Sequence, residues 1–248
     1  MSTPIRPLRR TAAGGAVLLS LCALSLTACG DDGDTSATDD TTPSASATSP
    51  SASDTGAAAS GTTCDYVAGG DAARKVDLPP STPDVSGQVP ATIATNIGDL
   101  EVTLDADATP CTVNSFVSLA KQGYFDKTTC HRLTTAPSGI YVLQCGDPLG
   151  TGYGGPGYTI PDEFTGEETY GPGVLAMANT GAPNSGGSQF FIVYQDSPLP
   201  PQYTVFGTLD KASLAAVTKD AEAGADNSNG PGDGKPVKGV DITSVTVG

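Results

Sequence analysis

The stretch PNSGGSQFFIVY, from Pro183 to Tyr194, places a loop of small and polar residues directly before a short apolar run. The aromatic and β-branched residues of that run are typical of a β-strand. Successive side chains of a strand leave on opposite faces, so Phe190 and Phe191 point in opposite directions. One phenylalanine can enter a core, whereas the other needs a different partner on the face that it shares with Gln189.

The segments around this stretch show the same alternation. Residues 89–108 predict two strands, because Ile93 and Leu100 each belong to an alternating apolar series and a turn at 96–99 separates the two series. Short apolar runs between glycine-rich connections predict further strands in residues 128–134, 140–147, 171–180, 188–194, 203–209 and 239–247. The chain lacks the regular alternation of helix and strand that a doubly wound fold requires.

Two segments have a helical period instead. The first is expected to start with Thr109 as N-cap and Pro110 at the first helical position, and to end near Gly123. The second is expected to begin at Asp210, which is a good N-cap residue. Residues 90–247 therefore predict an all-β fold of about eight short strands with two helices, which favours one closed antiparallel barrel.

The first residues of the chain indicate export. A basic segment is followed by an apolar run at 12–26 that is short for a membrane-spanning helix, so residues 1–28 are expected to be a signal peptide. The sequence LTAC at 26–29 resembles a bacterial lipobox, in which Cys29 carries lipid after cleavage; an ordinary signal peptide with an incidental cysteine is the alternative. The resemblance to a lipobox implies a protein outside the cytoplasm, anchored by lipid to the outer face of the bacterial cell membrane.

A tether and an extension are expected to precede the folded domain. Residues 29–62 are rich in Ser, Thr, Asp and Ala and contain no Leu, Ile, Val or aromatic residue, so they predict a disordered tether. A flexible coil of that length would span about 30 Å. Residues 63–88 predict an irregular, proline-rich extension on the surface of the domain that residues 89–248 form, and Cys64 is a candidate for fixing it there.

The charge of the chain limits its partners. The formal net charge is −15, and an acidic surface argues against nucleic acid or anionic lipid as the main partner. Solubility is sufficient to explain the excess of acidic residues. No sequence feature indicates a cofactor or an assembly larger than a monomer.

The cysteines suggest disulfide bonds. If Cys22 leaves with the signal peptide and Cys29 is lipidated, four cysteines remain, an even number that in an exported domain indicates two disulfides with three possible pairings: Cys64, Cys111, Cys130 and Cys145. A zinc site that includes Cys130 and His131 is the alternative. Adjacent strand residues point to opposite faces, which argues against that site, so no metal is expected.

Common catalytic motifs are missing from the sequence. There is no phosphate-binding loop, no Ser-His-Asp order and no pair of candidate carboxylates. The glycine-rich run GTGYGG at 150–155 does not have the strand-loop-helix setting of a dinucleotide site. His131 is the sole histidine of the chain, which excludes most hydrolase schemes. The remaining polar candidates are one arginine on a predicted hairpin, two glutamines and one asparagine.

These remaining residues stand in four sequence blocks: CHRL at 130–133, LQCGD at 143–147, GVLAMANTGAPNSGGSQFFI at 173–192 and TVFGTL at 204–209. Together they resemble the cyclophilin family of peptidyl-prolyl isomerases over residues 90–247. The resemblance implies a closed, eight-stranded antiparallel barrel capped by two α-helices. It also implies catalysed rotation of Xaa-Pro peptide bonds, proline-containing polypeptides as partners and, with the signal peptide, a role in folding exported proteins.

Two alternatives to catalysis remain. The domain would be a non-catalytic module or chaperone that binds proline-containing peptides at the cell surface, or a structural cell-surface protein that reuses the fold.

By the resemblance, Arg132 is the catalytic arginine and Gln144 is the glutamine that holds it. The expected substrate-binding residues are Tyr141, Val142, Ala178, Asn179, Gln189, Phe191, Leu199 and Tyr203.

Some positions depart from the family pattern. The segment 197–207 has Pro198 near the place of a tryptophan that many members carry, and Tyr203 stands in place of a histidine, so cyclosporin binding is expected to be weak. The connection at 134–141 is longer than usual. Cys130 stands where phenylalanine is common, opposite Cys145 on the predicted hairpin. Since Cys130 stands opposite Cys145, we expect the disulfides Cys130–Cys145 and Cys64–Cys111.

Overall fold

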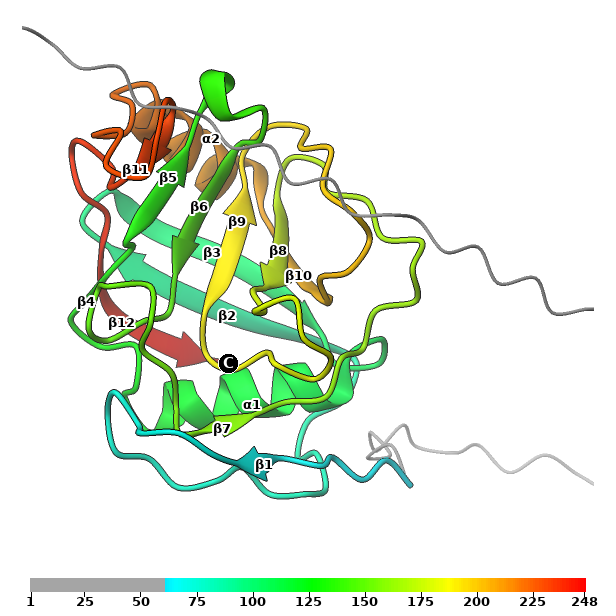
Figure 1. The fold of residues 1–248 in the computed structure, drawn as a ribbon. Helices are drawn as coiled ribbons and strands as arrows, with labels where there is room; N and C mark the ends of the chain where they lie inside the picture. Colours follow the sequence, from blue (N-terminus) through cyan, green and yellow to red (C-terminus); the bar gives the residue numbers. More distant parts are fainter. Residues whose placement is uncertain (1–60) are drawn as a thin grey trace, which may run out of the picture. The chain divides into compact units, whose positions relative to one another are not determined.

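The computed structural model describes residues 61–248, and the predicted signal peptide, Cys29 and the tether up to residue 60 lie outside the described residues. The described part is an all-β fold with two α-helices, as predicted (Figure 1). Within residues 61–248, none of the helices has the length and apolar character needed to cross a membrane.

Ten strands form one curled, antiparallel sheet. They are β2 (Gln88–Thr95), β3 (Gly98–Asp105), β4 (Thr128–Thr129), β5 (Arg132–Thr134), β6 (Val142–Cys145), β8 (Val174–Met177), β9 (Phe190–Val193), β10 (Val205–Leu209), β11 (Asp233–Gly234) and β12 (Asp241–Val247). Their order in the sheet is β11-β5-β6-β9-β8-β10-β3-β2-β12-β4. The predicted turn between β2 and β3 is present at Asn96 and Ile97.

The closed, eight-stranded barrel is not reproduced in detail, because the sheet has ten strands and its hydrogen-bonded order has two ends. The segment predicted as one strand, 128–134, is divided. The amide of Cys130 donates to the carbonyl of Val240 beside β12, whereas the amide of His131 donates to the carbonyl of Gln144 in β6. Cys130 and His131 are adjacent in the chain, but they bond to segments on different sides of the sheet order, beside β12 and in β6. This change of partner separates β4 from β5.

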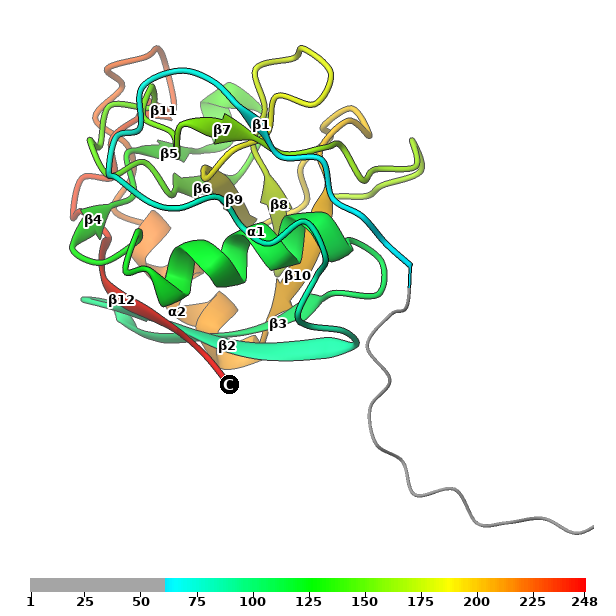
Figure 2. The ribbon, with the colours of Figure 1, turned by 90° about the horizontal axis from the view of Figure 1, so that it is seen from below.

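The helices α1 (Pro110–Lys121) and α2 (Lys211–Ala221) lie at opposite ends of the curled sheet (Figures 1 and 2). Asp210 caps α2 as predicted, since its side chain accepts a hydrogen bond from the amide of Ser213 at 2.7 Å. The helix α1 starts at the predicted position, but Thr109 makes no side-chain cap. Glu163 takes that role.

Glu163 comes from a distant loop and accepts hydrogen bonds from the amides of Cys111 and Thr112, at 2.9 and 2.7 Å. A carboxylate beside the first amides of a helix satisfies donors that have no partner within the helix and also interacts favourably with its dipole. At the other end, Gly123 follows α1 with a φ of 66°, which is the left-handed conformation expected of a residue after a helix.

The extension 63–88 lies along the outer side of α1 (Figures 1 and 2). It contains a short strand, β1 (Val67–Ala68), that pairs antiparallel with β7 (Tyr158–Thr159) in a separate two-stranded sheet. Arg74 donates from Nη1 to three backbone carbonyls just beyond α1, over 2.7 to 2.9 Å: those of Gly123, Tyr124 and Asp126. The extension is therefore held to the helix by polar contacts.

The two phenylalanines of β9 enter different clusters. Phe190 lies in the main core between the sheet and α1, where its ring meets that of Phe116 edge to face at 5.6 Å. Phe191 belongs to a second, smaller cluster on the other face of β6, β8 and β9, together with Val142, Tyr170, Ala176 and Val193. The strand alternation predicted for this stretch is confirmed, and the small cluster marks where to look for a site.

Candidate functional site

Four residues of neighbouring strands stand in one row across the sheet. Arg132 of β5 lies opposite Gln144 of β6, Gln144 lies opposite Phe191 of β9, and Phe191 lies opposite Ala176 of β8. Residues directly opposite each other have side chains on the same face. Adjacent strands are about 4.8 Å apart, so the backbones of Arg132 and Phe191 are about 10 Å apart, and one small ligand can contact both side chains.

A pocket of about 230 Å³ lies over this row. It is smaller than the pockets of about 300–1,000 Å³ that bind drug-sized ligands, and it suits a single side chain or ring. One rim carries the guanidinium of Arg132, and the opposite walls are mainly apolar. The lining residues are Arg132, Ile140, Val142, Gln144, Ala178, Asn179, Phe191, Leu199 and Tyr203.

The structure brings together most of the residues expected at the substrate site, but two lie elsewhere. Gln189 shares the face of Phe191 and lines a neighbouring pocket instead. Its Oε1 accepts from Gln144 Nε2 at 2.9 Å, and its Nε2 donates to the carbonyls of Gly152 and Gly154, both at 2.9 Å. Gln189 thereby joins the glutamine beside Arg132 to the glycine-rich loop.

The structure places Tyr141 outside this pocket, against the main core. Val142 and Gln144 face the pocket, so by alternation Tyr141 faces the other side of the sheet and Ile140 takes the pocket position. The ring of Tyr141 packs edge to face on that of Tyr194, at 5.8 Å. The long connection that includes the 3₁₀ turn η1 (Ala136–Ser138) makes the alignment ambiguous by one residue, and one residue reverses the face.

Asp233 is a site residue that the sequence did not reveal. Arg132 donates from Nε to Asp233 Oδ1 at 2.8 Å and from Nη2 to Oδ2 at 2.6 Å. Its Nη1 donates to Gln144 Oε1 at 3.3 Å. The hydrogen bond from Arg132 lowers the pKa of Asp233, and the same bond raises the pKa of Arg132, so both groups are charged at neutral pH.

Asp233 lies in the two-residue strand β11, which pairs with β5, and a structured loop precedes it. Asp226 Oδ1 accepts from the amides of Ser228 and Lys235, at 2.9 and 2.8 Å. A Cβ on Gly234 would lie 2.1 Å from the same oxygen, so a glycine is required there. Asn229 also donates to Asp233 Oδ1, at 3.1 Å. The sequence shows an acid between two glycines, a pattern that does not by itself point to Arg132.

Aromatic contacts fix the apolar side of the pocket. The rings of Phe191 and Tyr203 meet edge to face at 5.3 Å. Tyr170 supports them from below, since its hydroxyl donates to the carbonyl of Tyr203 and accepts from the amide of the same residue. Asn179 is held by a hydrogen bond from its Nδ2 to the carbonyl of Gln202, at 2.8 Å. The wall opposite Arg132 is therefore preorganised.

A disulfide lies directly beside the arginine. Cys130 and Cys145 are joined, as expected, with their Cα atoms 4.0 Å apart, slightly below the usual range of about 4.4–6.8 Å. Cys130 lies two residues before Arg132, between β4 and β5, and Cys145 follows Gln144 in β6. Because the sulfur of Cys130 is oxidised, it is not a thiolate ligand, and the structure gives no support to the alternative zinc site with His131.

His131 is almost fully buried, with its ring next to Gly152 of the glycine-rich loop. Neither of its ring nitrogens has a hydrogen-bond partner among the described residues. Burial is the main cause that lowers its pKa, and the nearby charge of Arg132 acts in the same direction. The imidazole is consequently neutral at physiological pH and supplies no charge to the pocket.

Comparison with known families gives a match over most of the described residues. The sequence profile of the family described as "Cyclophilin type peptidyl-prolyl cis-trans isomerase/CLD" matches residues 91–247. A protein of Mycobacterium tuberculosis named "Probable peptidyl-prolyl cis-trans isomerase B" is 48% identical over 200 residues, which cover 75% of this chain and 64% of that protein. Its Mycobacterium leprae counterpart is 44% identical, over 75% of this chain and 66% of the relative. The chain thus spans about two thirds of the length of these relatives.

Solved structures give the same result. A cyclophilin-type peptidyl-prolyl cis-trans isomerase of Cryptosporidium parvum superimposes with a TM-score of 0.57 at 32% identity, covering 65% of this chain and 98% of that one. The same parasite protein was also solved in the presence of the dipeptide Ala-Pro, and this structure superimposes with a TM-score of 0.55 at 31% identity, over 64% and 98% of the two chains.

Proposed function

The chain belongs to the cyclophilin-type peptidyl-prolyl cis-trans isomerases, and from that premise we propose that it catalyses rotation about the peptide bond before proline in polypeptides. The observation that carries the proposal is that Arg132 and Phe191 lie in one cross-strand row and line one pocket. A single Xaa-Pro dipeptide can therefore meet the cation and the apolar wall together.

The reaction needs no bond to be broken. The peptide bond resists rotation by about 18–20 kcal/mol, because the nitrogen shares its lone pair with the carbonyl. Before proline the cis and trans forms are close in energy, but they exchange over tens to hundreds of seconds. A catalyst has to bind the twisted state more tightly than either planar state.

Arg132 supplies the group that distinguishes the twisted state. When the amide twists, conjugation is lost and the proline nitrogen regains a lone pair that can accept a hydrogen bond. A guanidinium has five N–H donors, and Gln144 and Asp233 take three of those of Arg132, which leaves two for a substrate. A fixed donor aimed at developing basicity stabilises the transition state without reorganisation.

The pocket binds the proline ring of the substrate. The aromatic wall of Phe191 and Tyr203 and the aliphatic side chains of Val142 and Leu199 provide an apolar seat for the proline ring. Ala178 and Asn179 lie at the edge of the pocket, where a substrate backbone would pass. An acceleration of about 10⁵ corresponds to about 7 kcal/mol of barrier. A charge-assisted hydrogen bond, exclusion of water and positioning supply energies of this order together.

The proposal includes a closed barrel, which the resemblance implies. Its support is that β4 and β5 are nearly continuous in the chain, since only Cys130 and His131 separate them. Because β4 pairs with β12 and β5 pairs with β6, this short link brings the two sides of the sheet close together. Rigid closure at this point would hold Arg132, which immediately follows, in a constant position.

The proposal also includes the setting in which the enzyme works. Two disulfides, Cys130–Cys145 and Cys64–Cys111, are typical of proteins in an oxidising compartment, which supports export and a role in folding exported proteins. We further propose a monomer attached to the outer face of the membrane by lipid on Cys29, and weak cyclosporin binding. Labelling with a radioactive fatty acid in the producing cell tests the anchor, with Cys29→Ala as the control that should lose the label.

A binding module without turnover is the second candidate, and the pocket itself is the observation that favours it. Its apolar wall and the two remaining N–H donors of Arg132 would bind a proline peptide whether or not they favoured the twisted state. A protease-coupled assay on a short Ala-Pro peptide separates the two functions. We expect the rate of isomerisation to rise in proportion to protein concentration, whereas a rate equal to that in buffer, with the peptide still bound, would support the binding module.

A further inference from the structure

A second pocket of about 430 Å³ adjoins the proline pocket. The two pockets share three lining residues, namely Gln144, Ala178 and Asn179. They are therefore parts of one groove. An extended chain advances about 3.3 Å per residue, so a polypeptide whose proline sits over Phe191 reaches the second pocket with a residue a few positions away.

One wall of this second pocket comes from outside the segment that the family profile matches. Gly69, Gly70 and Asp71 line it, and they belong to the extension that precedes the residues matched by the family profile. The other walls come from segments of the domain itself, residues 152–159, 178–180 and 185–189. The shape of the second pocket is therefore a property of this chain and not of the family domain alone.

Backbone hydrogen bonds hold the extension against the domain at this wall. The amide of Gly69 donates to the carbonyl of Gly157 at 3.0 Å, and the amide of Ala73 donates to that of Gly155 at 2.8 Å. A Cβ on Gly157 would lie only 3.0 Å from the Cβ of Ala72, and the φ of Gly157 is 83°. The close approach thus depends on glycine on the domain side.

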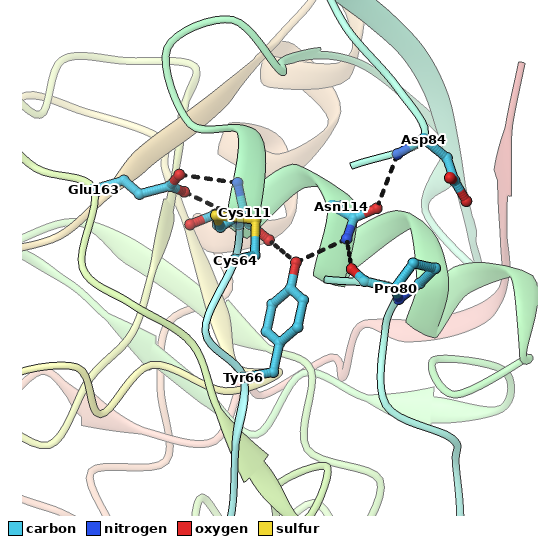
Figure 3. The surroundings of a disulfide bond; sticks show 8 residues. Cys64, Tyr66, Pro80, Asp84, Cys111, Asn114 and Glu163 are labelled. Atoms are coloured by element: carbon cyan, nitrogen blue, oxygen red, sulfur yellow. Dashed lines mark hydrogen bonds between the residues drawn. A yellow bond between two sulfur atoms is a disulfide. The ribbon is translucent and has the colours of Figure 1, made fainter. Parts of the chain in front are cut away.

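Side-chain contacts hold the start of the extension to α1 (Figure 3). The disulfide Cys64–Cys111 joins it to the first turn of the helix. The hydroxyl of Tyr66 donates to the carbonyl of Cys111 at 2.9 Å and accepts from Asn114 Nδ2 at 2.8 Å. Asn114 Nδ2 also donates to the carbonyl of Pro80 at 2.8 Å, so one asparagine joins both ends of the extension to the helix. The wall is a fixed part of the fold.

The charges along the groove are opposite at its two ends. Of the residues that line the second pocket within the described part of the chain, Asp71 alone is charged, and its side chain is exposed. The proline pocket carries Arg132. A basic substrate side chain in the second pocket would meet a carboxylate there and would be farther from the guanidinium than a residue next to the proline.

We propose that Asp71 makes this enzyme select substrates with a lysine or arginine within three residues of the proline. The inference rests on the proposed isomerase function and adds a specificity determinant to it. An exposed ion pair contributes little, so the expected preference is modest: a kcat/KM about two- to five-fold higher for the basic peptide.

The test uses the purified protein and peptides that contain Ala-Pro with Lys, Gln or Glu at each of the three positions on either side. We expect Lys to exceed Gln, and Gln to exceed Glu, at one of these positions, and the order to be lost in Asp71→Asn. Asp71→Lys should reverse the order. Asp65→Asn removes the same charge from an exposed residue of the extension that does not line the pocket, and should keep the preference.

The outcomes are distinguishable. If the wild type isomerises every peptide but ranks Lys and Glu equally at all positions, Asp71 has no selective role. A preference that survives in Asp71→Lys, or disappears equally in Asp65→Asn, contradicts the inference as well, because the effect would then come from the overall charge of the domain. If the wild type accelerates no peptide at all, the isomerase proposal itself fails.

Discussion

Arg132 donates to both carboxylate oxygens of Asp233, over 2.8 and 2.6 Å, although 101 residues separate the two in the sequence. The carboxylate occupies Nε and one Nη, and Gln144 occupies the other Nη. A guanidinium held on two sides has few rotamers left. We therefore treat Asp233 as a positioning residue, which acts on the substrate through Arg132.

Replacing Asp233 tests that role. Hydrogen bonds to charged groups contribute about 1.5–3 kcal/mol, so Asp233→Ala should lower kcat at least about tenfold while KM changes little. Asp233→Asn keeps an acceptor toward Arg132 and should recover part of the loss. Full progress curves over a range of peptide concentrations separate kcat from KM.

The control for Asp233 is Asp99→Ala, which removes an exposed carboxylate far along the sheet order, in β3. It should leave both constants unchanged. A faster enzyme in Asp233→Ala would show the opposite of our account, because the ion pair would then restrain Arg132 instead of positioning it.

Phe191 should determine the affinity for proline. Phe191→Leu keeps an apolar side chain but removes the aromatic wall, and a contact of this kind is worth about 1–3 kcal/mol, so kcat/KM should fall about tenfold or more. Thermal unfolding should show that the variant is folded. Phe190→Leu is the matched control: it alters the main core, lowers stability and should leave kcat/KM of the folded fraction near that of the wild type. Equal activity of Phe191→Leu and the wild type would place the proline elsewhere.

Stability should depend on pH through His131. Burial lowers the pKa of this histidine in the folded state below its ordinary value of 6.5. Below pH 6.5 the unfolded chain therefore binds a proton that the folded chain does not, and the free energy of unfolding should decrease as the pH falls toward the lowered pKa. Urea titrations at several pH values measure this, and His131→Gln should flatten the dependence. No change between pH 7 and 5 in the wild type would be incompatible with a buried, neutral imidazole.

The acidic side of the same profile has a separate cause. The hydrogen bond from Arg132 lowers the pKa of Asp233 below 3.8, so the stability gained from this group is present above that value and is lost as the pH falls through the lowered pKa. Burial acts to raise the pKa of Asp147, but backbone amides of the following loop outweigh it and lower that pKa too. Asp233 and Asp147 should therefore change the free energy of unfolding only at pH values well below those at which His131 changes it.

The disulfide beside the site should contribute to stability. Cys130 and Cys145 are 15 residues apart, and closing a loop of this length in the unfolded chain is worth about 3 kcal/mol. For a domain of this size, 1 kcal/mol shifts Tm by about 2–4 °C, so Cys130→Ala with Cys145→Ala should lower Tm by about 6–12 °C. Differential scanning calorimetry measures the shift, with reduced and oxidised wild type alongside. An unchanged Tm would mean that the cross-link constrains nothing that the strands do not already fix.

The alternation around Phe190 and Phe191 could be predicted because a strand with one face in the core has to place successive residues on opposite faces. The pairing of Arg132 with Gln144 is implied by the family resemblance of the CHRL and LQCGD blocks, and it agrees with the prediction that these two blocks form one hairpin. Asp233 could not be predicted in the same way: its strand, β11, has only two residues within an aperiodic segment, and no local pattern relates it to a hairpin about 100 residues away.

Two other details depended on geometry that the sequence does not encode locally. Tyr141 lies outside the pocket because the length of a connection decides which residue of the next strand faces it. The extension was expected on the domain surface, but its contribution to a pocket was not, since backbone pairing between Gly69 and Gly157 leaves no side-chain signature.

The most direct test of the isomerase proposal is the role of the guanidinium. Exchange NMR on an Ala-Pro peptide should measure the catalysed exchange rate and the peptide affinity for wild type, Arg132→Ala and Arg132→Lys. We predict rapid exchange for the wild type, and a loss of about 100-fold or more in Arg132→Ala with peptide affinity retained, since one preorganised donor is worth about 10²–10³ in rate. Arg132→Lys should recover little, because an ammonium lacks the planar fork. Wild-type exchange that persists in Arg132→Ala would contradict the account.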